Sequence, residues 1–181
     1  MEFSILYGIY RTQLLDGIML FITNLAGSLG QIWLIVGIIL IIFKKTRRTG
    51  IAVIVSYIGV YLLGQLLLKN LFVRPRPCQI DQAFALIVDR PTSPSFPSTH
   101  SAWAFAAASA IFYKFRKAGI GVFVFAALIA FSRMYLFLHF PTDVLAGIAL
   151  GIILGTLSAI LCDRVAKGGM KPAGETQEER E

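Results

Sequence analysis

The segment TGIAVIVSYIGVYLLGQLLL, residues 49–68, contains no charged side chain. A bilayer core about 30 Å thick requires about 20 residues of helix, because an α-helix rises about 1.5 Å per residue. Residues 49–68 are therefore long and apolar enough to cross a membrane. Their apolar side chains form a continuous run rather than one helical face, which excludes an ordinary amphipathic helix of a soluble protein.

Much of the remaining chain has the same character. Residues 118–133 and 144–161 approach or meet this length with almost no internal charge, whereas residues 31–43 and 101–113 are shorter and need extension upstream to span. A first span is expected near residues 17–25, after an interfacial helix. The composition, 56% hydrophobic and 15% charged residues in a chain of 181, lies well outside that of soluble domains. We expect an all-α, polytopic membrane bundle of about six helices.

One domain is expected, at residues 1–167, because the chain is too short for more. The sequence after residue 167 turns to Gly, Pro, Glu, Lys and Gln, which predicts a disordered cytoplasmic tail at residues 168–181. Cys78 and Cys162 fall on opposite sides of the predicted membrane, so no intramolecular disulfide is expected. The amino terminus lacks the pattern of a removable signal peptide.

Lysine and arginine residues gather in three connections between the predicted spans. All three connections lie on one side of the membrane in this arrangement, and cytoplasmic connections carry the excess of such residues. We therefore predict that the long segment 70–97 is an extracytoplasmic loop carrying part of the active site. The net charge of +7 is mostly this topology signal, and no nucleic-acid partner is expected. The connections contain Lys44, Lys45, Arg47 and Arg48, then Lys114, Arg116 and Lys117, then Arg164, Lys167 and Lys171.

The first of three stretches that place polar chemistry beside apolar segments joins Lys69 to RPRP, residues 74–77. A lysine at the end of a span commonly extends its amine to the interface, and an isolated arginine pair commonly contacts lipid headgroups. Each proline also drives the arginine before it into an extended conformation, just outside a span. This stretch alone is compatible with lipid contact or with anion binding.

The second stretch is PSFPSTH, residues 94–100, in which Ser98 is a favourable N-cap for a following helix. A helix N-terminus presents unpaired backbone N–H groups and a positive dipole to an anion. His100 would lie in the first turn, beside such an anion. A lone histidine near a helix start is more often structural than catalytic, so both interpretations remain open.

The third stretch contains Arg133, His139 and Asp143. A cation at the end of an apolar span is costly enough to indicate a function. If the chain coils after His139, the carboxylate of Asp143 can accept a hydrogen bond from one imidazole nitrogen and leave the lone pair of the other directed outward. The alternative is an Asp N-cap with a surface histidine nearby. All three stretches fall on one predicted membrane face. If each stretch had only a structural role, their meeting on that face would be a coincidence.

Together these stretches resemble the signature of the type 2 phosphatidic acid phosphatase superfamily, which also includes the vanadium haloperoxidases. The family motifs read Lys, six residues, Arg-Pro; Pro-Ser-Gly-His; and Ser-Arg, five residues, His, three residues, Asp. The resemblance covers about residues 50–162. One residue departs from the motifs: Thr99 stands where the family has a glycine, which lets the backbone approach phosphate closely. The matching residues are Lys69 with Arg76-Pro77, Pro97-Ser98-Thr99-His100, and Ser132-Arg133 with His139 and Asp143.

The resemblance implies a lipid phosphatase that works without metal or cofactor. His139 would be the nucleophile and form a phosphohistidine, Asp143 would hold its tautomer, and His100 would protonate the leaving oxygen and then activate water. Fixed cations would take the role of a metal ion toward the phosphate oxygens. The implied phosphate-binding residues are Lys69, Arg76, Ser98, Thr99 and Arg133.

A site on the outer face favours a lipid phosphate or diphosphate of the outer leaflet. Undecaprenyl diphosphate is the leading candidate, with phosphatidylglycerol phosphate, phosphatidic acid and lipid A phosphate as alternatives. A haloperoxidase is disfavoured because those relatives are soluble, and a non-catalytic lipid or anion transporter is disfavoured by both histidines and Asp143 at motif spacing. Phe84, Leu86 and Ile87 either line a lipid entrance or dip into the headgroup region.

Overall fold

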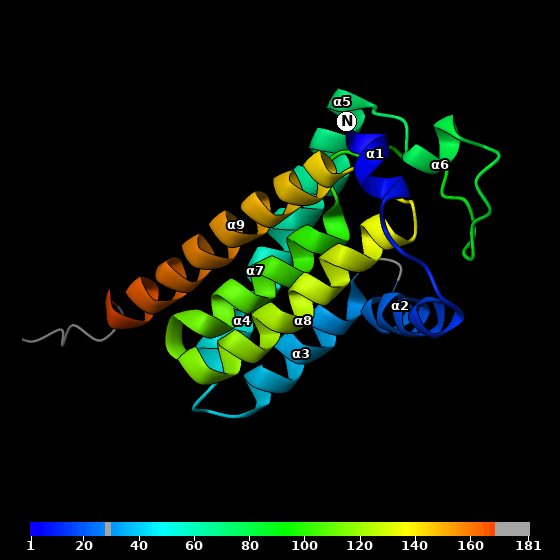
Figure 1. The fold of residues 1–181 in the computed structure, drawn as a ribbon. Coiled ribbons are helices and arrows are strands. Elements are labelled where there is room, and N and C mark those ends of the chain that lie inside the picture. Colours follow the sequence, from blue (N-terminus) through cyan, green and yellow to red (C-terminus); the bar gives the residue numbers. More distant parts are fainter. Residues whose placement is uncertain (28–29, 169–181) are drawn as a thin grey trace, which may run out of the picture.

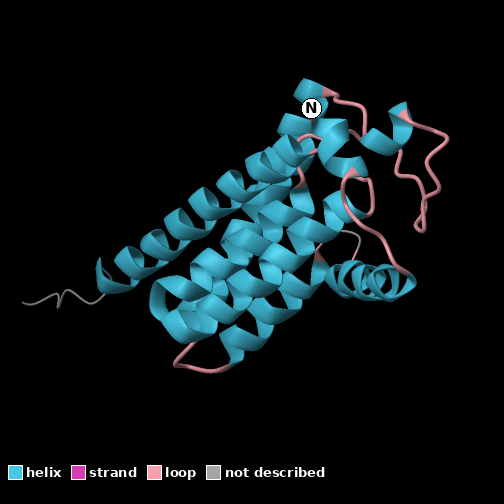
Figure 2. Cartoon of the chain, in the orientation of Figure 1, coloured by secondary structure: helices cyan, strands magenta, loops and turns pink. Residues whose placement is uncertain are grey.

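The computed structural model describes residues 1–27 and 30–168, and every regular element within them is a helix (Figure 2). The predicted all-α class is confirmed. The predicted tail lies outside the described residues, apart from Gly168, which ends the last helix. The elements are α1 (Glu2–Tyr7), α2 (Gln13–Ala26), α3 (Gln31–Ile42), α4 (Arg47–Val60), the π-helix η1 (Tyr61–Leu68), α5 (Lys69–Phe72), α6 (Pro77–Ile80), α7 (Thr99–Lys114), α8 (Arg116–Tyr135) and α9 (Pro141–Gly168) (Figure 1).

Six long helical segments form the predicted membrane bundle. They are α2, α3, the uninterrupted α4–η1–α5, α7, α8 and α9. Among the described residues, the ranges 47–80, 116–135 and 141–167 are long and apolar enough to cross a membrane. α2 and α3 meet the same criterion when taken together as one span bent by 54°. The short α1 precedes them, in the place of the expected interfacial helix.

α7 is the central helix of the bundle, in contact with α3, α4, α8 and α9. It extends only two residues upstream of the predicted segment 101–113, so its sixteen residues remain short for a span. Its core positions are mostly alanine and serine, and small side chains allow neighbouring helices to approach closely. Neighbouring helices therefore bury most of α7.

Glycines of α9 bring its backbone against that of α7. Gly147, Gly151 and Gly155 recur every four residues and so lie on one face of the helix. A Cβ atom added at these glycines would lie 2.3, 2.4 and 2.2 Å from the carbonyl oxygens of Ser98, Ala102 and Ala106, respectively. The helix that begins with the PSTH motif and the helix that contains Asp143 are therefore held at backbone contact.

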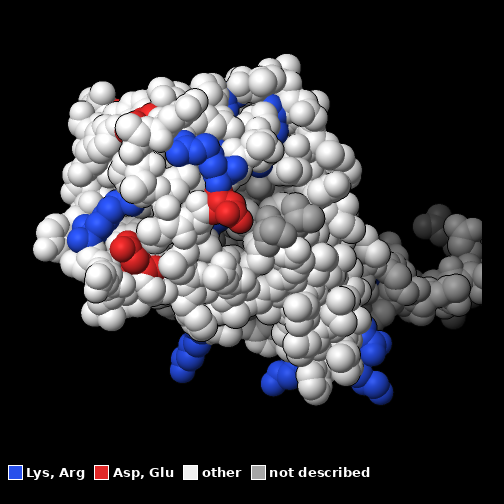
Figure 3. All heavy atoms as spheres, turned by 90° about the vertical axis from the view of Figure 1, so that its right-hand side faces the viewer, with Lys and Arg blue, Asp and Glu red and all other residues white. Residues whose placement is uncertain are grey.

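The three basic connections meet at one end of the bundle, as the sequence predicts. Lys114 Nζ donates a hydrogen bond of 3.5 Å to the carbonyl oxygen of Lys45, and Arg48 lies 3.8 Å from Asp163 of α9. Figure 3 shows Lys and Arg side chains projecting from the lower edge of the molecule, and a separate group of basic and acidic side chains on the upper part of the face. α1, α5 and α6 lie at the opposite end of the bundle (Figure 1).

Candidate active site

A cavity of about 430 Å³ receives side chains from all three sequence stretches. Its walls come from α2, the η1–α5 junction, the segment between α6 and α7, the first turn of α7, and the connection between α8 and α9. The fold thus brings together groups as far apart in the chain as Thr23 and His139. The predicted site residues that line the cavity are Lys69, Arg76, Thr99, His100, Arg133 and His139.

The π-helix η1 determines where Lys69 points. The Lys69 backbone N–H donates to the carbonyl oxygen of Gly64, five residues earlier, so this turn is wider than an α-turn. The Lys69 residue is only 4% exposed. Within the described part of the chain, no hydrogen bond or ion pair occupies its Nζ atom, so this buried charge can act on a ligand in the cavity.

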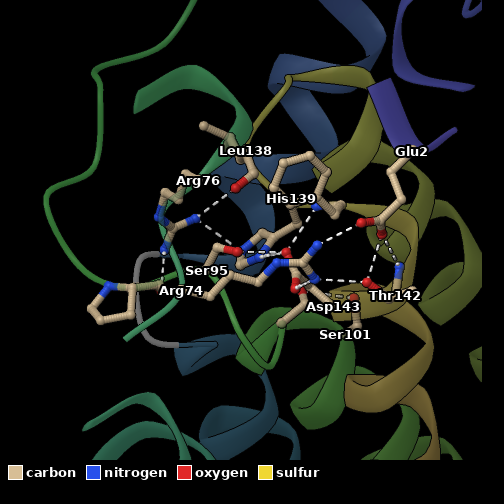
Figure 4. A network of polar contacts seen from close by, with 12 residues as sticks. Glu2, Arg74, Arg76, Ser95, Ser101, Leu138, His139, Thr142 and Asp143 are labelled. Carbon is tan, nitrogen blue, oxygen red and sulfur yellow. Dashed lines mark hydrogen bonds and ion pairs between the residues drawn. The ribbon is translucent and has the colours of Figure 1, made fainter. Parts of the chain in front are cut away.

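Arg76 joins the long connection between α6 and α7 to the connection that carries His139. Its Nε donates to Ser93 O at 2.8 Å, and its Nη2 donates to Ser93 Oγ at 3.1 Å and Pro94 O at 3.3 Å. On the other side, Nη1 donates to Leu138 O at 3.0 Å and lies 3.0 Å from His139 Nε2 (Figure 4). The guanidinium group is therefore fixed in direction as well as in place.

The contact with Arg76 decides the tautomer of His139. A guanidinium group has only donors, so Nε2 of His139 must be the acceptor and the proton of the neutral ring lies on Nδ1. Burial lowers the pKa of His139, which keeps the ring neutral at pH 7. A neutral imidazole whose Nε2 lone pair faces a cation-lined cavity has the form that a nucleophile requires.

Asp143 is close to His139 but does not accept a hydrogen bond from it. The His139 Nδ1 and Asp143 Oδ2 atoms are 3.8 Å apart, and Nδ1 has no hydrogen-bond partner among the described residues. Asp143 Oδ2 instead accepts from Ser95 Oγ at 2.6 Å and Phe140 N at 2.8 Å, and Oδ1 accepts from Arg74 Nη1 at 2.7 Å. The predicted proximity is therefore present, whereas the predicted hydrogen bond is not formed, because other donors hold the carboxylate.

His100 is anchored between α2 and α7. Its Nε2 lies 2.9 Å from the carbonyl oxygen of Gly27, which can only accept, so Nε2 carries a proton. The ring meets Trp103 edge to face, and the Trp103 indole N–H donates to Tyr57 O at 3.2 Å. Nδ1 is thus the nitrogen of His100 that remains for proton exchange.

Ser98 is the N-cap of α7, as predicted, but its side chain makes no capping hydrogen bond. Its hydroxyl lies 3.0 Å from Ser101 Oγ, and its backbone N–H donates to the carbonyl oxygen of Asp143 at 2.9 Å. Ser98 does not line the cavity. It ties the start of α7 to the start of α9 from behind the cavity wall.

Thr99, which replaces the usual family glycine, lies in the cavity wall as the first residue of α7. Its hydroxyl donates to Gln65 Oε1 at 3.4 Å. Its methyl group faces Gly64, where an added Cβ would come within 3.2 Å of Thr99 Cγ2. The glycine in η1 therefore leaves room for the threonine of α7.

Arg133 shapes the connection that presents His139. Its carbonyl oxygen accepts hydrogen bonds from Leu138 N at 3.0 Å and His139 N at 3.2 Å. Phe137, inside this turn, has a positive φ of 60°, which non-glycine residues adopt rarely. The Arg133 guanidinium group donates to Ser132 Oγ at 3.3 Å through Nε and Nη2, and the side chain also lines the cavity.

Several cavity residues were not identified from the motifs. Gln65 is a polar residue inside the apolar run 49–68, and this contrast could have identified it as a site residue. The other polar residues of the lining have no distinguishing pattern in the sequence. Phe84, Leu86 and Ile87, for which a lipid entrance or headgroup contact was expected, do not line this cavity. Phe84 stacks on Phe137 with ring centroids 4.0 Å apart. The additional polar residues of the lining are Thr23, Asn24, Gln65, Asp89 and Ser93.

The cavity combines three cationic side chains with one carboxylate and two imidazoles. Among the described residues, no group of three or more His, Cys, Asp and Glu side chains is arranged to hold a metal ion. The positive charge that side chains present to a ligand comes from Lys69, Arg76 and Arg133. Such a site can bind a phosphate group and place a nucleophilic nitrogen beside it.

Comparisons with known proteins agree with this chemistry. The undecaprenyl-diphosphatase of Sulfolobus acidocaldarius is 31% identical over 145 residues, covering 80% of this chain and 69% of that protein. Undecaprenyl-diphosphatase BcrC of Bacillus subtilis is 30% identical over 160 residues, covering 86% of this chain and 79% of that protein. The crystal structure of a transmembrane PAP2 type phosphatidylglycerolphosphate phosphatase from Bacillus subtilis superposes with a TM-score of 0.66 and 30% identity, covering 91% of this chain and 82% of that one.

The family model of the PAP2 superfamily matches residues 49–165, which run from the start of α4 almost to the end of α9 and include every motif residue of the cavity. The chain therefore belongs to the PAP2 superfamily and is one of its membrane lipid phosphatases.

Proposed function

We propose that this protein removes one phosphate group from undecaprenyl diphosphate through a covalent phosphohistidine on His139. The proposal depends most on the 3.0 Å contact between His139 Nε2 and Arg76 Nη1 at the cavity wall. A phosphate group entering the cavity would accept the Arg76 hydrogen bond in place of the imidazole. The Nε2 lone pair would then be free to attack phosphorus.

In the first step a bond forms between His139 Nε2 and the terminal phosphorus, and the bond from phosphorus to the bridging oxygen breaks. His100, which enters this step as an imidazolium beside the bound phosphate, keeps its Nε2 proton on Gly27 O and gives its Nδ1 proton to the bridging oxygen, so undecaprenyl phosphate leaves. In the second step His100 takes a proton from water, whose oxygen attacks phosphorus and breaks the bond to Nε2. Inorganic phosphate is released and both imidazoles return to their starting forms.

Charge spreads over the phosphate oxygens in each transition state, and cations fixed in the wall stabilise it. Lys69, Arg76 and Arg133 are buried around the cavity, where water screens their charges little. Thr99 would contribute through its backbone N–H at the start of α7, whereas the Ser98 N–H is held by the carbonyl oxygen of Asp143 and Ser98 would act only by fixing the start of this helix. No metal ion or cofactor is required in this scheme.

The basic end of the bundle supports one orientation of the protein in the membrane. The basic connections gather at the end of the bundle away from α1, α5 and α6. Because such connections stay in the cytoplasm, the site would open on the extracytoplasmic face of the cell membrane. A lipid diphosphate of the outer leaflet could reach it there.

The substrate proposal can be tested by measuring phosphate release side by side from undecaprenyl diphosphate, phosphatidylglycerol phosphate, phosphatidic acid and lipid A in detergent. Two relatives named undecaprenyl-diphosphatase support the first lipid, and we expect kcat/KM to be highest for it. The His139→Ala variant provides the blank for each lipid. A tenfold or greater preference for another lipid would refute the substrate and leave the reaction class intact.

Replacing His100 with alanine should slow turnover by about 10²–10⁴-fold, because the leaving oxygen loses its acid and the water loses its base. Inhibition by vanadate, a phosphate analogue, should be nearly unchanged, because the three cations remain. His100→Gln is the matched variant, since its amide can still donate to Gly27 O but cannot exchange a proton. If vanadate inhibition is lost in both variants, His100 is a ligand rather than an acid and base.

A further inference from the structure

Arg74 bridges two carboxylates at the edge of the site without lining the cavity. Its Nη1 donates to Asp143 Oδ1 at 2.7 Å and to Thr142 Oγ1 at 2.7 Å, and its Nη2 donates to Glu2 Oε2 at 2.5 Å. Its guanidinium carbon lies 4.4 Å from the centre of the Phe140 ring. Figure 4 shows the guanidinium group between Glu2 on one side and Asp143 on the other.

Glu2 belongs to α1 but holds the first turn of α9 as well as Arg74. Its Oε1 accepts from Thr142 Oγ1 at 2.6 Å and from Thr142 N at 3.3 Å. A carboxylate at a helix N-terminus is favourable because it faces the positive end of the helix dipole. Burial acts to raise the pKa of Glu2, but the hydrogen bonds from Thr142 and Arg74 outweigh burial and lower the pKa, so Glu2 is charged at pH 7.

Asp143 is fully buried, and a buried carboxylate is costly unless it is paired and hydrogen-bonded. Among the described residues, Arg74 is the guanidinium that forms an ion pair with it. The contact is on Oδ1, whereas Oδ2 is the oxygen on the side of His139 Nδ1. Arg74 thus holds the carboxylate from the side opposite the imidazole.

The distance between His139 and Asp143 gives this arrangement a role in the reaction. Attack on phosphorus makes the imidazole positively charged, and Asp143 must then accept the Nδ1 proton in a hydrogen bond. The resting distance of 3.8 Å must shorten by about 1 Å to reach that geometry. The carboxylate can make this movement productively only if it stays ionised and keeps Oδ2 toward His139.

We propose that Arg74 is a positioning residue that keeps Asp143 ionised and oriented toward His139, and that Glu2 of α1 anchors Arg74 in this role. The inference rests on the function proposed above for His139. It makes α1, which lies outside the matched family region, part of the catalytic arrangement. It also separates Arg74 from Arg76, which lines the cavity and would contact phosphate.

Arg74→Ala should lower kcat by about 10²-fold, below the roughly 10⁴-fold cost of disabling the carboxylate of a catalytic triad. KM and vanadate inhibition should change less than about threefold, because Arg74 does not line the cavity. Arg74→Lys should recover part of kcat, since one ammonium can reach one of the two carboxylates. Glu2→Gln should give a smaller loss of kcat than Arg74→Ala.

Arg90→Ala is the matched control. It removes an exposed arginine from the same end of the bundle and should behave as wild type.

A double-mutant cycle with Asp143→Asn identifies the pathway of the effect. If Arg74 acts through Asp143, adding Arg74→Ala to Asp143→Asn should cause no further loss of kcat. Losses that multiply would overturn the inference, as would a tenfold weaker vanadate inhibition with unchanged kcat. A lower melting temperature with wild-type kcat per folded molecule would reduce Arg74 to a structural role.

The two proposals fail in different ways. Activity that survives in His139→Ala removes the proposed mechanism and the inference with it. An inactive His139→Ala together with wild-type kcat in Arg74→Ala removes only the inference. If Arg74→Ala does not fold, wild-type kcat in both Arg74→Lys and Glu2→Gln would overturn the inference equally.

Discussion

Replacing His139 with alanine should reduce phosphate release by on the order of 10⁴-fold or more, to the level left by substrate binding alone. The other nitrogens of the wall are unsuited to replace it, because lysine and arginine are cations and the free Nδ1 of His100 is assigned to proton exchange. The measurement is single-turnover release of inorganic phosphate from undecaprenyl diphosphate in detergent. Hydrolysis at the wild-type rate would show that the nucleophile is assigned wrongly.

A second readout of the same variant tests the intermediate directly. Rapid quenching of the wild-type protein with a labelled terminal phosphate should trap a phosphoryl group that is stable in alkali and labile in acid. The label should be absent from His139→Ala, while inorganic phosphate still binds because the cationic wall is intact. Loss of phosphate binding in this variant would mean that the substitution has damaged the site rather than removed a nucleophile.

Replacing Gly155 with alanine should destabilise the bundle by about 1–3 kcal/mol or more, because overpacked positions must shift their surroundings. The new Cβ would lie 2.2 Å from Ala106 O and 2.9 Å from the Ala106 carbonyl carbon. These are backbone atoms of the central helix, so α7 and α9 would have to move apart. The measurement is the melting temperature of the purified protein in detergent.

Gly121→Ala is the matched control for that substitution. Gly121 also lies in a helix, α8, but an added Cβ would meet nothing within 4 Å. Alanine favours a helix over glycine by up to about 1 kcal/mol, so this variant should melt at the wild-type temperature or slightly above it. Equal melting temperatures for Gly155→Ala and Gly121→Ala would contradict the backbone contact between α7 and α9.

The long helices could be predicted because each had a clear physical signal. Residues 118–133 and 144–161 have almost no internal charge, and they lie within α8 and α9. α7 was harder, because alanine and serine carry little hydropathy and its membrane position depends on its neighbours. The π-helix η1 could not be predicted, since nothing in its composition distinguishes a shift in hydrogen-bond partner from i−4 to i−5.

The motif spacing predicted most of the cavity wall but not the contacts behind it. Lys69, His100 and His139 are at the wall because each motif fixes its residue at the end of a helix or in a short connection. The contacts of Asp143 with Arg74 and Ser95 depend on segments separated by 69 and 48 positions, which no local pattern specifies. For the same reason, the four-residue spacing of His139 and Asp143 predicted that the two side chains are close. It did not predict which groups donate hydrogen bonds to the Asp143 carboxylate.

The π-helix η1 also limits how this gene can change in length. A π-turn holds more residues than an α-turn, so losing one residue between positions 61 and 68 would let the segment relax to ordinary α-helical geometry. The wide turn would absorb that loss, so residues beyond the deletion would keep nearly the same orientation about the helix axis. A second deletion would find no wide turn to absorb it and would rotate Lys69 by about 100° about the helix axis, away from the cavity wall, although its spacing to Arg76 in the sequence would be untouched. This span can therefore lose one codon here, whereas the loss of a second would remove a cation from the site while leaving every family motif intact.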